Sequence, residues 1–326
     1  MGQLHLVQAG FIKPIFEGVN DAGANLSNLL ISSSLNKFNL ENSENYVPVH
    51  SMYSFFDELN RQEGIADVLD QFSNYIHLAR LSQLGKMIAY RPNVYSAIQL
   101  AVKYDGVIAT NEQAGFEING IKSKYWQRFT DSQSNGREQA DFISFALALK
   151  GFQLAAGNDW APLEIHLQSN TSPNLDVLLP SSSHTKILLG QTATAIVFPT
   201  SMLTMPMLGL AVHSELVEEF PKFKTYASKI DNLLSSLEPN LIADLNLIAQ
   251  ITETPVRTMQ RRLSEEGTSI SKVIDQWRFI KAIQLLENAE LRVKDIYEQL
   301  GYANAPNFMR AFRRWTGVTP MSYRDQ

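Results

Sequence analysis

The sequence of 326 residues contains no cysteine. A cysteine thiolate is the nucleophile or the soft metal ligand in many sites. Its absence therefore excludes disulfide scaffolds, zinc fingers, iron–sulfur clusters and cysteine nucleophiles together. A chain without cysteine also fits a reducing compartment, so we expect a cytoplasmic protein.

Long hydrophobic runs are missing as well. The longest weakly polar stretch, Ser201–Val212, contains Pro206 and is shorter than the about 18 residues that a membrane helix requires. The N-terminus has neither a positively charged start nor an apolar run of signal-peptide length. We expect a soluble protein with no membrane partner.

The motifs of common enzymes are absent too. No G-x-S-x-G, G-x-G-x-x-G or Walker-type phosphate loop occurs, and no two histidines stand three or four residues apart as helical metal ligands. Ser183 and His184 are adjacent in a serine-rich segment, which is not the geometry of a catalytic triad. The sequence predicts no catalytic residue, no metal site and no cofactor, and thus a protein that is not an enzyme.

The net charge of −5 argues at first against a nucleic-acid partner, because phosphate binding favours a basic surface. The charge is unevenly distributed along the chain, however. Residues 1–230 carry −5 and residues 231–326 carry zero, and within the latter residues 255–326 hold 12 Lys and Arg against 8 Asp and Glu. A basic segment therefore follows an acidic one.

The length predicts about two domains. In the first 213 residues, helical periodicity is present at Ser51–Gln62, Asp67–Leu84, Val94–Tyr104 and Gln139–Leu154. Strands are expected at Phe116–Ile118 and Ile121, around a type I′ turn at Asn119-Gly120, and at Leu163–Leu167 and Thr192–Phe198. This mixture predicts an α+β domain.

The last 96 residues show helical patterns throughout. Helices are expected at Ala243–Ile251, Pro255–Glu265, Ser271–Leu286, Val293–Leu300 and Pro306–Trp315, with a break at Gly301. Two short helix pairs joined by a longer helix predict an all-α domain with two helix-turn-helix motifs and a linker helix.

The second helix of each pair has a polar, cationic face. The residues on these faces are Arg257, Thr258, Gln260 and Arg261 in the first, and Asn307, Arg310, Arg313 and Arg314 in the second. One such helix is ordinarily just a solvated surface, but two copies about 50 residues apart favour DNA binding. A connecting helix of sixteen residues is about 24 Å long, which with its turns approaches the ~34 Å between successive major-groove faces. Arginine matches the acceptors of guanine, and glutamine matches adenine.

Residues Thr254–Arg324 resemble the AraC/XylS-type DNA-binding domain over their whole length. The most specific pieces are Arg257–Arg261, Glu266–Thr268, Arg278, Leu300–Tyr302 and Phe308–Pro320. The resemblance implies base contacts by the first helix and by Asn307 and Arg310, with Arg313 and Arg314 nearer the phosphates. It implies a bacterial transcription regulator, with activator as its expected mode, that has double-stranded promoter DNA and RNA polymerase as partners. An alkyl-transfer DNA-repair protein shares this motif, but it works through cysteine and is excluded.

The sequence departs from that pattern at Pro255 and Pro306, where the family commonly has a serine that caps each recognition helix. Proline is tolerated in the first turn, and we expect Thr254 or Asn304 to supply the cap instead. Ala305 and Pro306 also replace residues that often form hydrogen bonds. We therefore expect the first recognition helix to carry most of the specificity.

A looser resemblance extends upstream. Leu81–Gly85, Asn93–Tyr104, Gly190–Thr192, Phe198-Pro199 and Leu203 look like the arabinose-binding-type sensor domain that is often fused to this DNA-binding domain. This implies residues 1–215 as an effector-binding and dimerisation domain, 216–230 as a linker and 231–326 as the DNA-binding domain. The partners are then an unidentified small-molecule effector and a second copy of the chain.

Nothing in the sequence selects the effector-binding residues. An apolar cavity could be lined by the aromatic residues Tyr90, Tyr95, Tyr104, Phe116, Tyr125, Trp126 and Trp160, although ordinary core packing explains each one alone. Candidate anchors for an anionic effector are Arg80, Arg91, Lys122 and Arg128. The alternative function is a ligand-independent DNA-binding co-regulator whose first domain only mediates protein contacts.

Overall fold

The structure is a computed structural model of the chain, and it describes residues 3–132, 134–207, 220–221, 223–239, 241–288 and 290–324. These residues divide into two compact units, which we describe separately. The first comprises residues 3–36 and 40–221, and the second comprises residues 37–39 and 222–326. His213 and residues 216–219 and 222 of the expected linker lie outside the described residues. No helix in the described ranges is long and apolar enough to cross a membrane.

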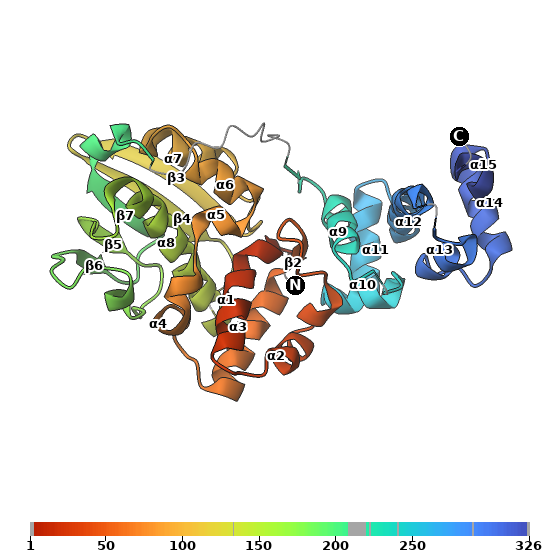
Figure 1. Cartoon of the computed structure of the whole chain (residues 1–326), viewed down its shortest axis with the longest axis horizontal. Helices are drawn as coiled ribbons and strands as arrows, with labels where there is room; N and C mark the ends of the chain where they lie inside the picture. Colours follow the sequence, from red (N-terminus) through yellow and green to blue (C-terminus); the bar gives the residue numbers. More distant parts are fainter. Residues whose placement is uncertain are drawn as a thin grey trace. The chain divides into compact units, whose positions relative to one another are not determined.

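The first unit is built on a five-stranded sheet with the order β3-β4-β7-β5-β6 (Figure 1). Its strands are β3 (Glu112–Asn119), β4 (Lys122–Phe129), β5 (Glu164–His166), β6 (Lys186–Leu188) and β7 (Thr194–Pro199). β5 and β6 run parallel, and the other neighbours are antiparallel. A separate two-stranded sheet pairs β1 (Leu6–Gln8) with β2 (Tyr46–Pro48).

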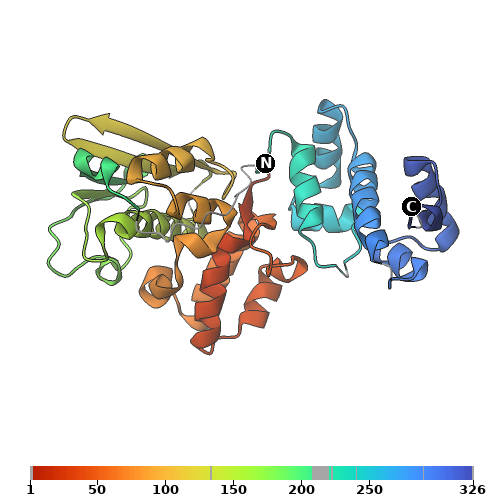
Figure 2. The ribbon, with the colours of Figure 1, turned by 45° about the horizontal axis from the view of Figure 1, so that its top comes forward.

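Eight α-helices accompany these strands in the described part of the first unit. They are α1 (Ala9–Asp21), α2 (Leu26–Ser32), α3 (Val49–Glu63), α4 (Val68–Phe72), α5 (Leu78–Leu81), α6 (Gln83–Ala89), α7 (Val94–Lys103) and α8 (Asn135–Ala156). Short 3₁₀ helices cover Leu35–Lys37, Ser73–Tyr75, Leu175–Val177 and Thr200–Thr204. Helices α1–α3 group together on the side away from the β3–β4 hairpin in both views (Figure 1, Figure 2).

Helix α8 is the centre of the first unit. It has buried apolar residues on every side, among them Phe142, Ile143, Phe145 and Leu149. A helix that is hydrophobic all round has to be covered on all sides. Accordingly, α8 packs against β7 on one side and against α3, α4, α5 and α6 on others.

The β3–β4 hairpin forms where the sequence predicted it, but its turn is of a different type. Asn119 pairs with Lys122, so the two central residues are Gly120 and Ile121 rather than Asn119 and Gly120. Of these two, only Gly120 has a positive φ, +61°. A type I′ turn needs a positive φ at both central residues, whereas type II′ needs it only at the first. The turn is therefore of type II′, because β-branched Ile121 disfavours the left-handed region.

The predicted helix Asp67–Leu84 is divided into several short pieces. Asp67 caps α4 by accepting hydrogen bonds from the N–H groups of Leu69 and Asp70. Ser82 is fully extended and caps α6, because its hydroxyl accepts from Gly85 N. Apolar spacing alone did not reveal these restarts, although aspartate and serine are preferred at helix starts.

The second unit is helical. Its helices are α9 (Tyr226–Ser235), α10 (Leu245–Ile251), α11 (Val256–Glu265), α12 (Ile270–Glu287), α13 (Val293–Gln299), α14 (Ala305–Thr316) and α15 (Pro320–Arg324). α12 lies between the pair α10–α11 and the pair α13–α14 (Figure 1). The predicted fold class, an α+β region followed by an all-helical region with two helix-turn-helix motifs and a linker helix, is confirmed. α9 begins inside the segment 216–230 that was predicted to be a linker, and the predicted domain boundaries remain a prediction.

Candidate nucleic-acid interface and ligand cavity

The turn of the first helix pair closes α10 with a Schellman motif. Thr254 N donates to Ala249 O at 3.1 Å, and Glu253 N donates to Gln250 O at 3.2 Å. Glu253 occupies the left-handed position with φ +47°, where glycine is the common residue. The turn therefore has the usual helix-turn-helix backbone with an unusual residue at its most constrained position.

Helix α11 divides cleanly into a buried and an exposed face. Met259 and Leu263 are completely buried, whereas Arg257, Gln260 and Arg261 are exposed and Thr258 is half-buried. The Arg261 side chain lies 3.8 Å from Glu265, one turn along the helix. The four predicted contact residues of this helix thus lie on or beside one polar face, which can enter a groove.

The start of α11 differs from the prediction. Pro255 is the N-cap residue, and among the described residues no side chain caps the helix there. Thr254, predicted as a substitute cap, is buried, and its hydroxyl donates to Thr252 O at 2.9 Å instead. That hydroxyl is thus directed back into the turn.

The second helix pair repeats the same turn with glycine. Tyr302 N donates to Tyr297 O at 2.9 Å, and Gly301 N donates to Glu298 O at 3.0 Å. Gly301 has φ +75°, and a Cβ added there would lie 2.4 Å from Cγ2 of Ile242. Glycine is required here both by conformation and by space.

Helix α14 starts with the cap that the sequence predicted. Asn304 Oδ1 accepts from Asn307 N at 3.0 Å, and Pro306 stands in the first turn. Phe308 and Phe312 are buried in a cluster with residues of α12 and α13, and Ala311 is also buried. The helix is therefore anchored by its apolar face and presents its polar face outwards.

The arginines of α14 are exposed but not equally available. Arg310 donates to Asn307 Oδ1 at 2.5 Å, and Arg314 pairs with Asp275 of α12 at 2.6 Å. Arg313 is exposed. The structure therefore brings Asn307 and Arg310 together and holds Arg314 beside the linker helix.

Two side chains that were not predicted as site residues fasten the elements of the second unit together. The Arg278 guanidinium of α12 lies 5.1 Å from the centre of the Tyr302 ring and 3.5 Å from Ala243 O. The Glu266 carboxylate accepts from the N–H groups of Tyr226 and Ala227 at 2.6 and 3.0 Å, and so caps α9. A carboxylate at a helix N-terminus is favourable because unpaired N–H groups and the helix dipole meet there. Both residues belong to sequence pieces that carried the family resemblance, which was the available signal.

Comparison with known proteins places this module in a family. Residues 248–326 match the family model described as a helix-turn-helix domain. The HTH-type transcriptional regulator VqsM of Pseudomonas aeruginosa is 25% identical over 265 residues, which cover 81% of this chain and 76% of that protein. The ornithine utilization regulator of the same species is 38% identical over 87 residues, 27% of this chain and 26% of that protein. Similarity to the latter is thus confined to about a quarter of its length.

A solved structure of the transcriptional regulator CdpR from Pseudomonas aeruginosa is similar with a TM-score of 0.40 and 16% identity, over 97% of this chain and 98% of that one. The fold, the two helix-turn-helix motifs and the family match define a DNA-binding transcription regulator. The family match covers the C-terminal part of the chain, where the sequence resembles the AraC-type helix-turn-helix domain.

The first unit contains an apolar cavity of about 110 Å³. It lies between β3, β4 and helices α5–α8. Its walls are mainly aliphatic, and its polar groups come from Asp105, Glu112, Gln127, Ser144 and the phenols of Tyr104 and Tyr125. Such a space, apolar with a few polar groups, is typical of a small-molecule site.

Of the seven aromatic residues predicted to line a cavity, the structure places Tyr104 and Tyr125 in this wall. Tyr95 and Phe116 border a separate, open depression together with Arg91. Tyr90, Trp126 and Trp160 border neither of these two spaces. The candidate cations Arg80, Arg91, Lys122 and Arg128 are all absent from the cavity wall, and Arg91 borders the open depression instead. Their role as anchors for an anionic effector stays a prediction.

The acidic residue Glu112 was missed by the sequence reasoning. It is on β3 two residues before Ala114, so the two side chains share the face that lines the cavity. Extending the alternation of the predicted strand upstream from Phe116 would have placed Glu112 on that face. Burial raises the pKa of its carboxyl to about 7, and nearby Asp141 and Asp105 raise it further, while the hydrogen bond from Ser144 lowers it.

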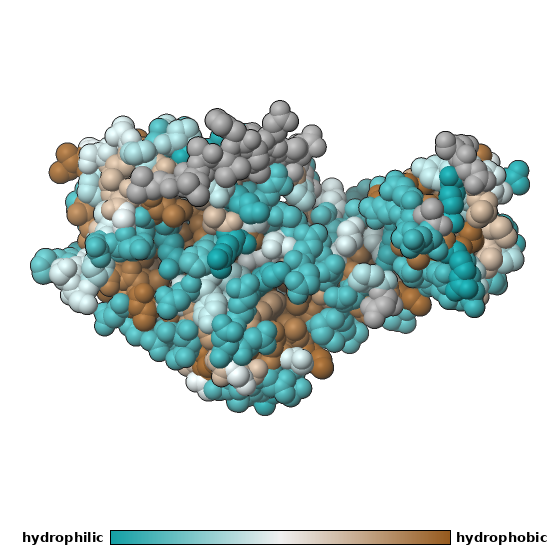
Figure 3. Space-filling view, in the orientation of Figure 1, coloured by the Kyte–Doolittle hydropathy of each residue, from teal (hydrophilic) through white to brown (hydrophobic). Residues whose placement is uncertain are grey.

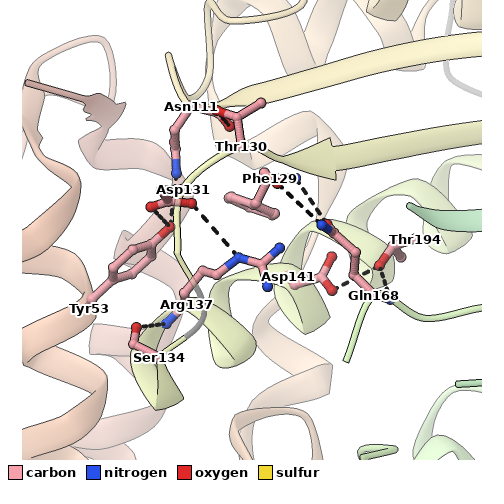
Figure 4. A network of polar contacts seen from close by, with 10 residues as sticks. All are labelled: Tyr53, Asn111, Phe129, Thr130, Asp131, Ser134, Arg137, Asp141, Gln168 and Thr194. Carbon is pink, nitrogen blue, oxygen red and sulfur yellow. Dashed lines mark hydrogen bonds and ion pairs between the residues drawn. The ribbon is translucent and has the colours of Figure 1, made fainter. Parts of the chain in front are cut away.

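A buried charged network lies on α8 next to this wall (Figure 4). Arg137 is 2% exposed, and its guanidinium lies between Asp131, 3.8 Å away, and Asp141. Thr194 donates to Asp141 at 2.8 Å, and burial raises the pKa of Asp141 to about 6 against the opposing effects of Thr194 and Arg137. The Gln168 side chain bonds both N and O of Phe129, which secures the end of β4.

Proposed function

We propose that the chain is a sequence-specific transcription regulator whose α11 and α14 enter adjacent major grooves of promoter DNA. Arg257, Thr258, Gln260 and Arg261 read the first groove, and Asn307 and Arg310 the second, with Arg313 and Arg314 near the phosphates. The observation that carries the proposal is the repetition of one turn geometry with a polar, arginine-bearing face on each second helix. On the face drawn in Figure 3 most of the second unit is hydrophilic, as a DNA-binding surface requires.

The length of the linker helix supports simultaneous binding. α12 has 18 residues, which gives about 27 Å at ~1.5 Å per residue. With its flanking turns this approaches the ~34 Å that separates successive major-groove faces on one side of the duplex. RNA polymerase and a second copy of the chain are the protein partners of this proposal.

We propose that the first unit binds a small effector in its cavity. Tyr104 forms part of the cavity wall, and its ring packs edge-on against Phe220 with the centroids 4.9 Å apart. Phe220 lies two residues before the second unit begins. A ligand that binds one arrangement of Tyr104 more tightly than another would shift the population toward that arrangement and so bias the position of Phe220. The ligand acts only through this difference in its affinity for the two arrangements.

The DNA-binding part is tested with the full chain and fragments selected by it from a random DNA library. Each neutralised phosphate adds about 0.9 to the negative slope of log affinity against log salt. We expect Arg313→Ala to lower that slope by about 1 and to weaken all sequences alike. Lys294→Ala is the matched control and leaves the slope unchanged, because Lys294 is an exposed residue of α13 that pairs with Glu298 at 3.8 Å. Binding that does not depend on salt would contradict the proposal.

A further inference from the structure

The cavity wall of the first unit contains acidic but no basic side chains among the described residues. Among the described residues that line it, Asp105 and Glu112 are acidic, and there is no lysine, arginine or histidine. A carboxylate ligand would have to be buried beside these acids with no cation to pair with it. Burying an unpaired charge is strongly unfavourable, so the wall selects against anionic ligands.

Glu112 is positioned to receive a cation. Ser144 Oγ donates to its Oε1 at 2.6 Å, and among the described residues this is the only hydrogen bond of the carboxylate. Its second oxygen therefore has no partner in the described part of the chain. The raised pKa of about 7 indicates that the carboxylate lacks the compensation that a positive group would give.

A second polar group in the wall is also without a partner. Gln127 lies opposite Ala114 in the β3–β4 pairing, and its side chain is 3% exposed. Its amide nitrogen has no hydrogen-bond partner within the described ranges. Buried amides are nearly always hydrogen-bonded, so this group is expected to meet a polar atom of a ligand or a water.

The rest of the wall limits the size and character of the ligand. A cavity of about 110 Å³ admits a compact ligand. Leu81, Leu84, Leu147 and Phe152 present hydrocarbon surface. The Tyr125 ring adds an aromatic face, which also attracts cations.

We infer that the cavity binds a small organic cation, a primary amine on a compact hydrocarbon body, whose ammonium group pairs with Glu112. The inference rests on the proposed effector-binding role of the first unit and names the chemical class of the effector. It replaces the expectation of an anionic effector. Ser144 orients the carboxylate, and the aliphatic side chains of α5, α6 and α8 enclose the hydrocarbon part.

The test uses the full chain and three matched sets of probes. The amines are phenethylamine, hexylamine and cyclohexylmethylamine; the second set has the corresponding alcohols, and the third the corresponding carboxylates. Binding is measured by calorimetry and by thermal shift. We expect at least one amine to bind, and to bind at least about tenfold more tightly than its alcohol, because hydrogen bonds to charged groups contribute about 1.5–3 kcal/mol.

Two variants on one strand locate the interaction. Glu112→Gln keeps the shape of the side chain and should reduce amine affinity about tenfold or more, while alcohols bind to it as they do to the wild type. Glu117→Gln is the matched control, because Glu117 is exposed and pairs with Lys124 at 3.0 Å on the other face of β3. We expect it to bind the amine as the wild type does.

The pH dependence gives a third measure. With a carboxyl pKa of about 7, the ionised fraction of Glu112 rises about tenfold between about pH 6 and pH 8, and the amine affinity should rise with it. Asp105, Asp141 and Tyr125 are the other titratable groups near this carboxyl, and the Tyr125 phenol stays neutral in this range because burial raises its pKa. Glu112→Gln should remove most of the dependence.

The outcomes separate the two proposals. If carboxylates or alcohols bind as tightly as amines, or if Glu112→Gln retains the amine, the inference fails while effector binding stands. If no probe of any set binds but DNA binding of the same sample stays salt-dependent, the inference and the effector role both fail, and the DNA-binding role stands. Loss of salt-dependent DNA binding is the failure of the proposed function itself.

Discussion

The two helix-turn-helix motifs of the second unit have the same turn with different residues. Both close the first helix with the same pair of backbone hydrogen bonds, yet the left-handed residue is exposed Glu253 in one and Gly301 in the other. At Gly301, Ile242 leaves no space for a Cβ. The comparison teaches that the hydrogen bonds define the turn, while the packing around it decides whether glycine is required.

The two recognition helices differ in their N-terminal caps and in the hydrogen bonds of their polar side chains. α14 has a side-chain cap from Asn304, and two of its polar residues, Asn307 and Arg310, bond to each other. α11 has no side-chain cap, and within the described residues neither the Arg257 nor the Gln260 side chain has a hydrogen bond or ion pair. The polar side chains of the capped helix α14 are therefore partly engaged with each other, whereas α11 offers more free donors to DNA.

The largest expected effect comes from giving the second turn a side chain. Gly301→Ala should lower the free energy of unfolding by about 2–4 kcal/mol, because a left-handed alanine is strained and its Cβ would clash with Ile242. Gly267→Ala is the control, since Gly267 has φ +71° but a Cβ added there would meet no atom within 4 Å, and it should lose only about 1 kcal/mol. Urea denaturation followed by circular dichroism measures both. Equal losses would show that space at Gly301 is unimportant.

The next effect tests which helix reads the bases. Gln260→Ala should weaken binding to a selected DNA site by about 1–3 kcal/mol, because a free amide can make a bidentate contact with adenine. Asn307→Ala should cost less, since Asn307 is half-buried and already accepts from Arg310. Fluorescence anisotropy on one site compares the two, with Gln276→Ala at an exposed position of α12 as a control of the same residue type. A larger loss of affinity from Asn307→Ala than from Gln260→Ala would contradict the assignment of specificity to α11.

The sequence predicted local features of the second unit well. The apolar spacing, the break at Gly301 and the cap at Asn304 depend on residues within a few positions of one another, and all three are present. Helix α9 was not predicted, because its burial depends on α11 and α12, which are distant in the sequence. The cap at Thr254 was wrong because that side chain is drawn into the turn.

The first unit was less predictable for the same reason. Its α+β character followed from local patterns, but the cavity forms only where β3 and β4 meet α5–α8. Cations were the natural candidates for an effector anchor, and the fold leaves them outside the wall and places Glu112 inside it. Which charged residue faces a cavity depends on tertiary packing. The alternation of side chains along one strand indicates which residues share a face, but it does not establish what that face packs against.

The smallest expected effect is a gain in the first turn. A left-handed non-glycine residue such as Glu253 is disfavoured by about 1–2 kcal/mol, and glycine removes this cost. Glycine also gives the unfolded chain more conformational freedom, which offsets about half of the gain. Glu253→Gly should therefore raise the free energy of unfolding by about 0.5 kcal/mol. Ser264→Gly, at an exposed right-handed position of α11, should lose about 0.5 kcal/mol instead. Urea denaturation resolves opposite signs even where the magnitudes are small. If both variants lose stability, the contacts of the Glu253 side chain outweigh its backbone strain, and the first turn is built around glutamate as firmly as the second is built around glycine.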